Sequence, residues 1–385
     1  MKQSSDRILT THTGSLPRPA AVADLLFAKE RGDAVDAATF DRTIADAVAD
    51  AVKRQVAIGI DVVSDGEMSK ISYATYIKDR ITGFEGDSPR KPPRDLQDFP
   101  TLMARLAKSG GTPSYKRPRC TGPIAVKDRE PLEIDLRNFA AAIRNSQPIE
   151  SFMNAASPGV IALFQPNEYY GSHDEYLEAL AEAMRPEYER IVEAGLVLQL
   201  DSPDLGLGRH MLFADKPVEE YERLASRHVE VLNHALRNVP VDRVRMHVCW
   251  GNYEGPHHHD VPMDRVLPIA IRAKIGALVF EASNPRHAHE WTIFRDARLP
   301  DHLILVPGVV DSTTNFVEHP KLVAERICHF TDAVGRERVI AGTDCGFATF
   351  AGFGAVDGEV AYAKLASMAE GAAIASDRLW RSVHR

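Results

Sequence analysis

Two thiols, an imidazole and a carboxylate stand at places in this sequence from which they can reach one metal ion. His247 and Cys249 are two residues apart in a segment typical of a buried strand, and residues two apart on a strand point to the same face. Cys345 and Glu281 each follow another short apolar run. Zinc binds cysteine, histidine and carboxylate ligands in tetrahedral shells. We therefore predict a zinc site of His247, Cys249, Glu281 and Cys345.

Other cysteines and histidines have simpler interpretations. Cys120 begins a strand pattern and Cys328 lies in a helical pattern, so both are expected to be packed. A metal-free alternative for Cys249 and Cys345 is that they are small buried hydrophobic residues. The run 257–259 is three histidines, but adjacent histidines on a loop rarely converge on one ion. We expect this loop only to border the site.

Further acidic residues follow predicted strands. Glu67, Asp201, Asp311 and Asp344 each lie at or just past the end of an apolar run. Carboxylates near a metal shuttle protons or support its ligands. For Asp311 and Asp344 both roles are open. Aromatic residues past strand ends, which are Tyr73, Tyr76, Trp250 and Tyr253, either pack or stack on a flat ligand.

The elements that must position these groups alternate between short apolar runs and amphipathic helices. Helical patterns are clearest around 44–56, 174–194 and 319–334. Eight strands are predicted, at residues 8–12, 60–63, 119–126, 196–200, 244–249, 277–282, 304–310 and 339–343. Eight such units predict an α/β fold, a (β/α)8 TIM barrel, whose chemistry lies at the C-terminal ends of the strands. A doubly wound sheet is the rival, but no glycine-rich dinucleotide fingerprint follows a strand.

One stretch exceeds a minimal barrel. Residues 86–118 hold six prolines and many basic residues, with a short helix predicted near 102–108. Long loops within a compact domain are usually lids or binding loops, although a solvated insertion is an equal alternative. We predict one barrel domain over 1–385 that carries this insertion after its second strand region.

Length and charge limit the classes of partner. The chain has 385 residues, of which 44% are hydrophobic and 26% charged, with a net charge of −8. An acidic balance argues against nucleic acid or an anionic membrane as the main partner. No apolar run approaches the length of a membrane span, and residues 1–18 lack a signal-peptide pattern. We expect a cytoplasmic protein, and a homo-oligomer is possible.

Several segments resemble one family in chain order. They are 13–17 (TGSLP), 65–67 (DGE), 121–123 (TGP), 199–203 (QLDSP), 247–249 (HVC), Glu281 and 344–346 (DCG). This set resembles the catalytic barrel of cobalamin-independent methionine synthase, with 121–123 matching its third-strand motif. The resemblance spans roughly residues 8–350 and favours the shorter, single-barrel members of the family.

The resemblance implies zinc-dependent transfer of a methyl or alkyl group to a small thiol. It implies that His247, Cys249, Glu281 and Cys345 bind zinc. It also implies that Ser15, Glu67 and Asp201 hold the amino and carboxylate groups of a thiol such as homocysteine. The expected partners are thus a small-molecule thiol and a methyl or alkyl donor.

Two departures from the family pattern bear on the substrates. No histidine follows Asp311 at the place where the family has an acid, so protonation of a departing folate nitrogen needs another donor. Ser202 stands where the family has a glutamate that favours homocysteine. Alkyl transfer to coenzyme M, as in epoxyalkane:coenzyme M transferase, is therefore an alternative.

Two other classes remain. A metal-free decarboxylase or lyase uses the same type of barrel, but it has no use for thiolate ligands. A non-enzymatic barrel with a closed structural zinc shell is the third class.

Overall fold

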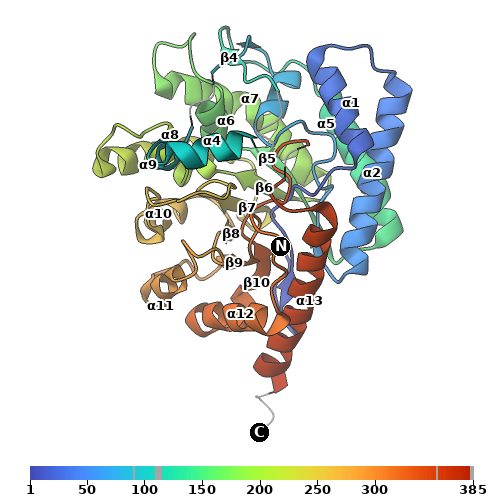
Figure 1. Cartoon of the computed structure of the whole chain (residues 1–385), viewed down its shortest axis with the longest axis vertical. Helices are drawn as coiled ribbons and strands as arrows, with labels where there is room; N and C mark the ends of the chain where they lie inside the picture. The colour runs from blue at the N-terminus through green and yellow to red at the C-terminus, as the bar shows by residue number, and fades with distance from the viewer. Residues whose placement is uncertain (90–91, 109–114, 353, 382–385) are drawn as a thin grey trace.

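The computed structural model describes residues 1–89, 92–108, 115–352 and 354–381. Its centre is an eight-stranded sheet, in the order β1-β10-β9-β8-β7-β6-β5-β2, in which every strand pairing is parallel (Figure 1). The strands are β1 (Leu9–Thr10), β2 (Val62–Val63), β5 (Glu150–Ala156), β6 (Val197–Asp201), β7 (Val244–Val248), β8 (Ala277–Phe280), β9 (Ile304–Val310) and β10 (Ile340–Thr343). A parallel bridge between Thr11 and Val62 joins the two ends of the sheet. The fold is a (β/α)8 TIM barrel, as predicted.

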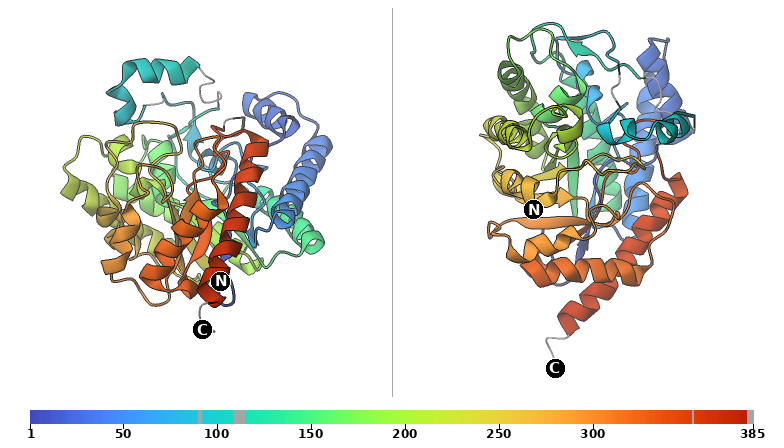
Figure 2. Two further views of the ribbon diagram at one scale, coloured as in Figure 1. Left: turned by 60° about the horizontal axis from the view of Figure 1, so that its bottom comes forward. Right: turned by 60° about the vertical axis from the view of Figure 1, so that its left-hand side comes forward.

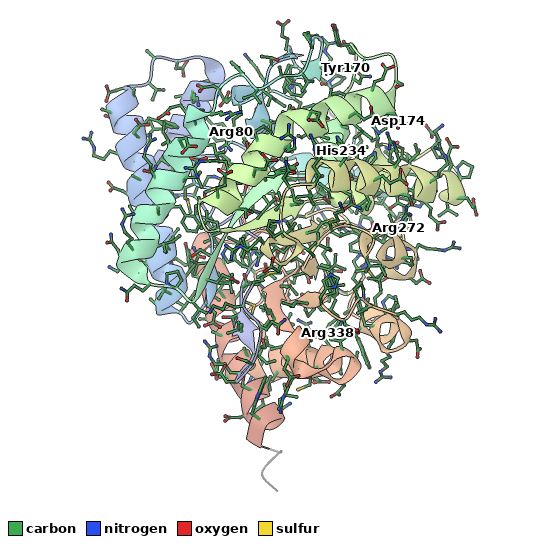
Figure 3. The ribbon with its side chains drawn as sticks, turned by 180° about the vertical axis from the view of Figure 1, so that it is seen from behind. Arg80, Tyr170, Asp174, His234, Arg272 and Arg338 are labelled. Atoms are coloured by element: carbon green, nitrogen blue, oxygen red, sulfur yellow. The ribbon has the colours of Figure 1, made fainter. Side chains whose placement is uncertain are left out.

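Helices surround the barrel, and their ends follow local sequence signals. Asp36 caps α2 by accepting a hydrogen bond from the Thr39 amide, and Ser172 caps α7 in the same way. The outer helices are α1 (Ala20–Arg31), α2 (Ala37–Ala57), α5 (Glu130–Ser146), α6 (Pro158–Phe164), α7 (His173–Glu193), α8 (Gly208–Met211), α9 (Val218–Ala235), α10 (Met263–Ala270), α11 (Ile293–Asp296), α12 (Pro320–Val334) and α13 (Gly358–Arg381). Their outward faces carry polar and ionisable side chains, including Asp174 on α7 and His234 on α9 (Figure 3). None of the helices within the described ranges has the length and apolarity to span a membrane.

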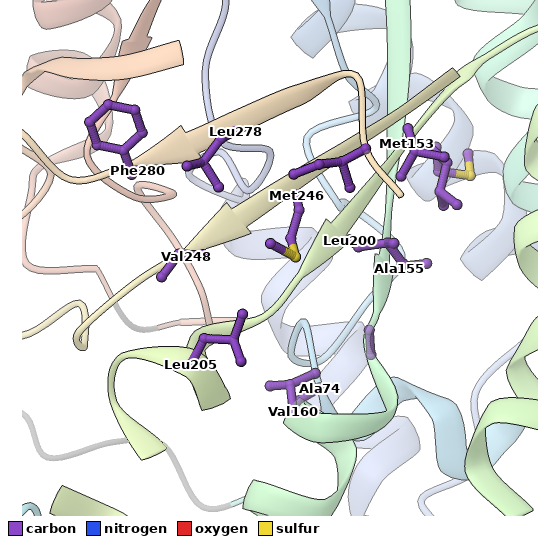
Figure 4. Packing of buried hydrophobic residues seen from close by; sticks show 14 of the residues in the cluster. Ala74, Met153, Ala155, Val160, Leu200, Leu205, Met246, Val248, Leu278 and Phe280 are labelled. Carbon is purple, nitrogen blue, oxygen red and sulfur yellow. The ribbon is translucent and has the colours of Figure 1, made fainter. Parts of the chain in front are cut away.

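The two faces of each strand have different partners. Met246, Val248, Leu278 and Phe280 point outward and join the large core between strands and helices (Figure 4). Phe280, for example, stacks on Phe294 of α11 at a centroid distance of 4.9 Å. Because side chains alternate along a strand, the residues between these point into the barrel.

The inward face changes from apolar to polar toward the C-terminal ends of the strands. The floor of the barrel consists of two apolar clusters, which comprise Leu9, Ala277, Val279, Ile304, Val306, Ile340 and Val62, Phe152, Val197. One step higher on their strands lie Gln199 and Arg245, joined by a hydrogen bond of 2.7 Å. Another step higher lie Asp201 and His247, which are partners in the β6–β7 register. The polar groups predicted to do chemistry thus stand on top of a packed interior.

The prediction that residues 119–126 form the third barrel strand was wrong. Residues 119–126 do not enter the barrel: β4 (Arg119–Cys120) pairs antiparallel with β3 (Phe84–Glu85) in a separate two-stranded sheet. The barrel position belongs to β5, which the sequence analysis did not identify. The segment 121–123, matched to a third-strand motif, therefore follows β4 outside the barrel. The apolar character of residues 119–126 reflects packing at the base of the insertion, where the Cys120 side chain is completely buried.

The insertion contains two short helices between β3 and β4. They are α3 (Arg94–Gln97) and α4 (Pro100–Lys108), and α4 includes the predicted helix near 102–108. Residues 90–91 and 109–114 of the predicted insertion lie outside the described residues. The two helices stand outside the ring of the other helices at one end of the barrel (Figure 2). Short 3-10 helices, η1 (Thr75–Asp79), η2 (Pro203–Leu205), η3 (Val241–Arg243), η4 (Glu290–Thr292) and η5 (Arg336–Arg338), complete the connections.

Phe152 tests how strongly the barrel floor stabilises the fold. Its ring lies 3.5 Å from the Arg245 guanidinium and edge-on to His12. Phe152→Ala should lower the free energy of unfolding by about 3–5 kcal/mol because it opens a cavity under a buried cation. Phe316 is 80% exposed, so Phe316→Ala should change the free energy of unfolding by less than about 0.5 kcal/mol. Urea unfolding measures both, and equal losses would contradict the assigned interior.

Candidate active site

A cavity of about 240 Å³ opens at the C-terminal ends of the barrel strands. Six of the residues predicted from the sequence line it together, namely Ser15, Glu67, Asp201, His247, Cys249 and Cys345. They come from segments that lie far apart in the chain. The other three predicted residues, Glu281, Asp311 and Asp344, are not among its lining residues.

The two cysteine sulfurs are placed as a shared metal ion would require. Cys249 Sγ and Cys345 Sγ are 3.8 Å apart. Two sulfurs on a tetrahedral zinc at the usual Zn–S distance are about 3.8 Å apart. A ring nitrogen of His247 completes the group, in which all ligand atoms lie within 4.8 Å of one another. All three side chains are buried.

His247 is in the protonation state that binds metals. Within the described part of the chain, neither of its ring nitrogens has a hydrogen-bond partner of normal geometry. Burial lowers the pKa of His247 to about 3, while the backbone carbonyl of Val279 opposes this shift. The ring is therefore neutral at physiological pH, and a buried, unpartnered neutral imidazole is a ready metal ligand.

The Cys249 thiol is held in its protonated form by its surroundings. Its hydrogen bond with Cys345 and its burial raise the pKa of Cys249 well above the usual value. The Gly251 amide, which donates to Cys249 Sγ at 3.2 Å, opposes this shift. A nearby cation would reverse this balance, because metal coordination deprotonates a thiol outright.

Glu281 lies beside Cys249 but outside the three-residue group. Its Oε1 accepts a hydrogen bond from the Trp250 amide at 2.8 Å, and its Oε2 accepts one from Asn284 Nδ2 at 2.7 Å. Burial, and then the neighbouring Cys249, raise the pKa of Glu281 well above its usual range. When it binds nothing else, this carboxyl group is therefore satisfied by two neutral hydrogen-bond donors.

Asp344 fixes the loop that carries Glu281. Its Oδ1 accepts from the amides of Ala282 and Ser283, and its Oδ2 accepts from the Asn284 amide, at 2.8–2.9 Å. A Cβ on Gly308 would lie 2.0 Å from Asp344 Oδ1, so the strand needs glycine there. Burial raises the pKa of Asp344 to about 6. Of the two predicted roles, these contacts favour support over proton shuttling.

Asp311 has a similar arrangement. Its Oδ1 accepts from the amide and hydroxyl of Thr313, and its Oδ2 accepts from the Thr314 hydroxyl at 2.6 Å. These donors belong to its own loop. A shuttling role for Asp311 stays a prediction that these contacts do not favour.

Hydrogen-bond acceptors gather at a second part of the cavity wall. Asp201 accepts from Asn154 Nδ2 at 3.0 Å and from Gln199 Nε2 at 2.9 Å, and burial raises the pKa of Asp201 to about 6. Glu67 is buried, and its Oε2 has no partner among the described residues. Burial raises the pKa of Glu67, with nearby Asp201 adding to the effect and Lys70 opposing it. This part of the wall suits a cationic group with several N–H donors.

Local backbone geometry presents these acceptors. Glu67 follows Gly66 in a tight turn, has a φ of 56°, and donates its amide to Asp65 Oδ1. Gly14 also has a positive φ, and a Cβ there would lie 2.3 Å from the Asn154 side chain. Ser15 is accommodated by Gly346, where a Cβ would lie 2.0 Å from the Ser15 hydroxyl. Glycines thus let the loops approach the cavity closely.

Asn154 is a cavity residue that the sequence analysis missed. It lines the cavity from β5, the strand that was not predicted, and links Asp201 to the Thr13 carbonyl. The alternation of residues 150–156, with Phe152 and Asn154 on one face, was the available signal.

Apolar and aromatic side chains form much of the remaining wall. They are Tyr73, Pro93, Leu96, Phe164, Pro203, Leu207, Met211, Tyr253 and Phe350. Pro93 and Leu96 belong to the insertion, so it borders the cavity. Tyr73 and Tyr253 are among the aromatic residues predicted near the site. The other two are packed elsewhere: the Tyr76 hydroxyl donates to Glu187, and the Trp250 indole donates to the Val261 carbonyl.

Comparisons with known proteins agree with this architecture. The family described as "Cobalamin-independent synthase, Catalytic domain" matches residues 8–89 and 98–373. The methionine synthase of Saccharolobus solfataricus is 25% identical over 384 residues, covering 97% of this chain and 96% of that protein. That of Sulfolobus acidocaldarius is 24% identical over 373 residues, covering 96% and 93%.

Solved structures share the fold. A B12-independent methionine synthase from Shewanella sp. W3-18-1, in complex with selenomethionine, has a TM-score of 0.72 at 17% identity and covers 97% of this chain and 99% of its own. A putative vitamin-B12 independent methionine synthase from Listeria monocytogenes has a TM-score of 0.62 at 19% identity, covering 96% and 98%. Because the family match extends over nearly the whole barrel, the chain belongs to the cobalamin-independent synthase family, as its catalytic domain, and is a methyltransferase that acts on a thiol.

Proposed function

We propose that this enzyme transfers a methyl group to the thiol of homocysteine, with zinc held by His247, Cys249, Cys345 and Glu281. The observation that carries the proposal is the 3.8 Å spacing of the two sulfurs beside a neutral imidazole whose nitrogens have no hydrogen-bond partner of normal geometry among the described residues. When bound, zinc lowers the pKa of the substrate thiol, so that a thiolate nucleophile is available at neutral pH. The names of the relatives support homocysteine as the acceptor.

Different residues bind the two ends of the acceptor and orient it for methyl transfer. Glu67, Asp201 and Asn154 bind the ammonium group of the acceptor, and the Ser15 hydroxyl donates to its carboxylate. The acceptor sulfur then forms a bond to the methyl carbon while the bond from that carbon to the donor breaks. The donor keeps that electron pair. Orientation of the acceptor relative to the donor supplies much of the rate, because it removes entropy from the reacting pair in advance.

Glu281 is assigned as the exchangeable fourth ligand. A catalytic zinc site keeps one position for substrate. Glu281 has waiting donors in the Trp250 amide and Asn284, at 2.8 and 2.7 Å, so release of this carboxylate leaves no buried oxygen unsatisfied.

The alternative acceptor, coenzyme M, fits the wall less well. A sulfonate needs cationic partners. Among the described residues that line the cavity there is no lysine or arginine, whereas Glu67 and Asp201 are both there. Two carboxyl groups favour an amino-acid thiol over a sulfonate thiol.

Metal content and zinc X-ray absorption test the proposal. Protein purified without added metal should carry one zinc per chain with two sulfur ligands, and Cys249→Ser and Cys345→Ser should each lose most of it. Cys328 lies on α12 away from the group, so Cys328→Ser is the matched control and should keep its zinc. Homocysteine should add a third sulfur ligand, and coenzyme M at the same concentration should not. An unchanged shell with homocysteine would falsify thiol activation and leave only structural zinc.

The pKa of Asp201 predicts a pH dependence of acceptor binding. Burial raises this pKa to about 6, so the carboxyl loses its charge as the pH falls through 6. Its attraction for an ammonium group is therefore complete above this pH and lost below it. KM for homocysteine should rise by up to about tenfold per pH unit below 6. With 2-mercaptoethanol, which has no amine, or in Asp201→Asn, this step should be absent. The same step with 2-mercaptoethanol would show that another group titrates.

Gly308→Ala tests the supporting role of Asp344. The new Cβ would lie 2.0 Å from Asp344 Oδ1 and 2.6 Å from the Asp344 backbone, so it must displace Asp344 and with it the loop of Glu281. Zinc affinity and kcat should fall about 10- to 100-fold, as for other losses of support around metal ligands. In Gly208→Ala the nearest neighbour of the new Cβ among the described residues is Phe213 at 3.9 Å, an ordinary contact, so both quantities should stay near the wild-type values. Competition with a chelator gives the affinity, and normal values in Gly308→Ala would show that Asp344 does not position Glu281.

A further inference from the structure

A second group of metal-binding side chains lies where the insertion meets the barrel. Asp98, which follows α3, accepts hydrogen bonds on its Oδ2 from His258 Nε2 at 2.9 Å and from His259 Nε2 at 2.6 Å. The ligand atoms of these three residues lie within 4.8 Å of one another. The sequence led us to expect that adjacent histidines would not converge, but here both rings reach one carboxylate oxygen.

The backbone turn before the two histidines explains their convergence. His257 has a φ of 52°, in the left-handed region that non-glycine residues rarely adopt. Its ring stacks on Tyr253 at 4.3 Å, and its Nδ1 hydrogen-bonds to Asp260 Oδ2 at 3.0 Å. With this turn fixed, the rings of His258 and His259 lie 4.1 Å apart, tilted by 37°.

The insertion is fixed against the same loop from its own side. Asp95, one helical turn before Asp98, is fully buried, and its Oδ2 accepts from the Tyr253 hydroxyl at 2.7 Å and from the His257 amide at 2.9 Å. Phe99 packs edge-on against the His258 ring. Both halves of the group are therefore held in place by contacts other than those within it.

We propose that Asp98, His258 and His259 bind a divalent transition-metal cation and so pin the insertion to the barrel loop. Imidazole nitrogen suits Zn²⁺, Ni²⁺ and Cu²⁺, and a carboxylate oxygen completes a three-ligand set. The carboxyl and imidazole groups are 29–48% exposed, so a cation can enter from solvent and keep water in its remaining positions. This site is separate from the cysteine group and does not depend on the proposed function.

The cation would act on the wall of the active-site cavity. Leu96 lies two residues before Asp98 and lines that cavity, as does Tyr253, which holds Asp95. A link between α3 and the barrel loop therefore fixes the wall where the insertion contributes to it. The expected effect is a more rigid insertion when the cation is bound.

Cobalt titration of the chelator-treated full chain distinguishes the two sites. Co²⁺ bound to cysteine sulfur gives charge-transfer absorption, whereas Co²⁺ bound to imidazole and carboxylate does not. We expect the site of Asp98, His258 and His259 in wild-type protein to bind one equivalent of Co²⁺ without charge-transfer absorption, separately from any Co²⁺ bound at the cysteines. Asp98→Asn and His258→Gln should each lose this equivalent. The loss of a ligand should weaken this site by at least about 100-fold, beyond what a supporting residue costs. Matched controls are Asp301→Asn and His302→Gln, which alter an exposed carboxylate and imidazole elsewhere.

Hydrogen exchange supplies a second readout. Zn²⁺ should slow amide exchange in residues 94–108 and 251–262 of wild-type protein but not of Asp98→Asn. The proposal is overturned if wild type and Asp98→Asn bind the same number of cobalt ions. It is also overturned if Zn²⁺ does not change the amide exchange rates of these segments in wild-type protein. Failure of the cysteine site alone would remove only the charge-transfer absorption and leave this result unchanged.

Discussion

The active site depends on the alternation of side chains along parallel strands. On β7 and just past it, Arg245, His247 and Cys249 point into the barrel one above another, and the alternate residues Met246 and Val248 pack outward against helices. A shift of one residue would put the outward set into the barrel and remove the imidazole and thiol together. The apolar core outside the barrel thus fixes which residues face the cavity.

The cavity combines two chemical surfaces that suit one class of acceptor. The sulfur and imidazole groups can take a soft cation, and Glu67 and Asp201 can take an ammonium group. The negative charges of Glu67 and Asp201 are costly to bury, as the raised pKa values of both carboxyl groups indicate. Groups that destabilise a fold in this way are common at functional sites, where a ligand compensates them.

Sequence reasoning succeeded where spacing along the chain reports spacing in three dimensions. The two-residue interval between His247 and Cys249 implied a shared face, and the ends of apolar runs marked the positions of Glu67 and Cys345. It failed where an apolar segment outside the barrel has the same pattern as a barrel strand. Residues 119–126 have the apolar character of a strand but pack at the base of the insertion, so β5 and Asn154 were missed. The convergence of His258 and His259 depends on a left-handed backbone at His257 and a carboxylate 160 residues away, neither of which the sequence reveals.

Anomalous diffraction at the zinc absorption edge, from crystals grown with homocysteine, tests the central claim most directly. The account predicts one strong peak in the cavity, about 2.3 Å from the sulfurs of Cys249, Cys345 and homocysteine and about 2.1 Å from a nitrogen of His247. The homocysteine amine should face Glu67 and Asp201. A cavity without an anomalous peak, or a peak whose sulfur ligands exclude homocysteine, would contradict it.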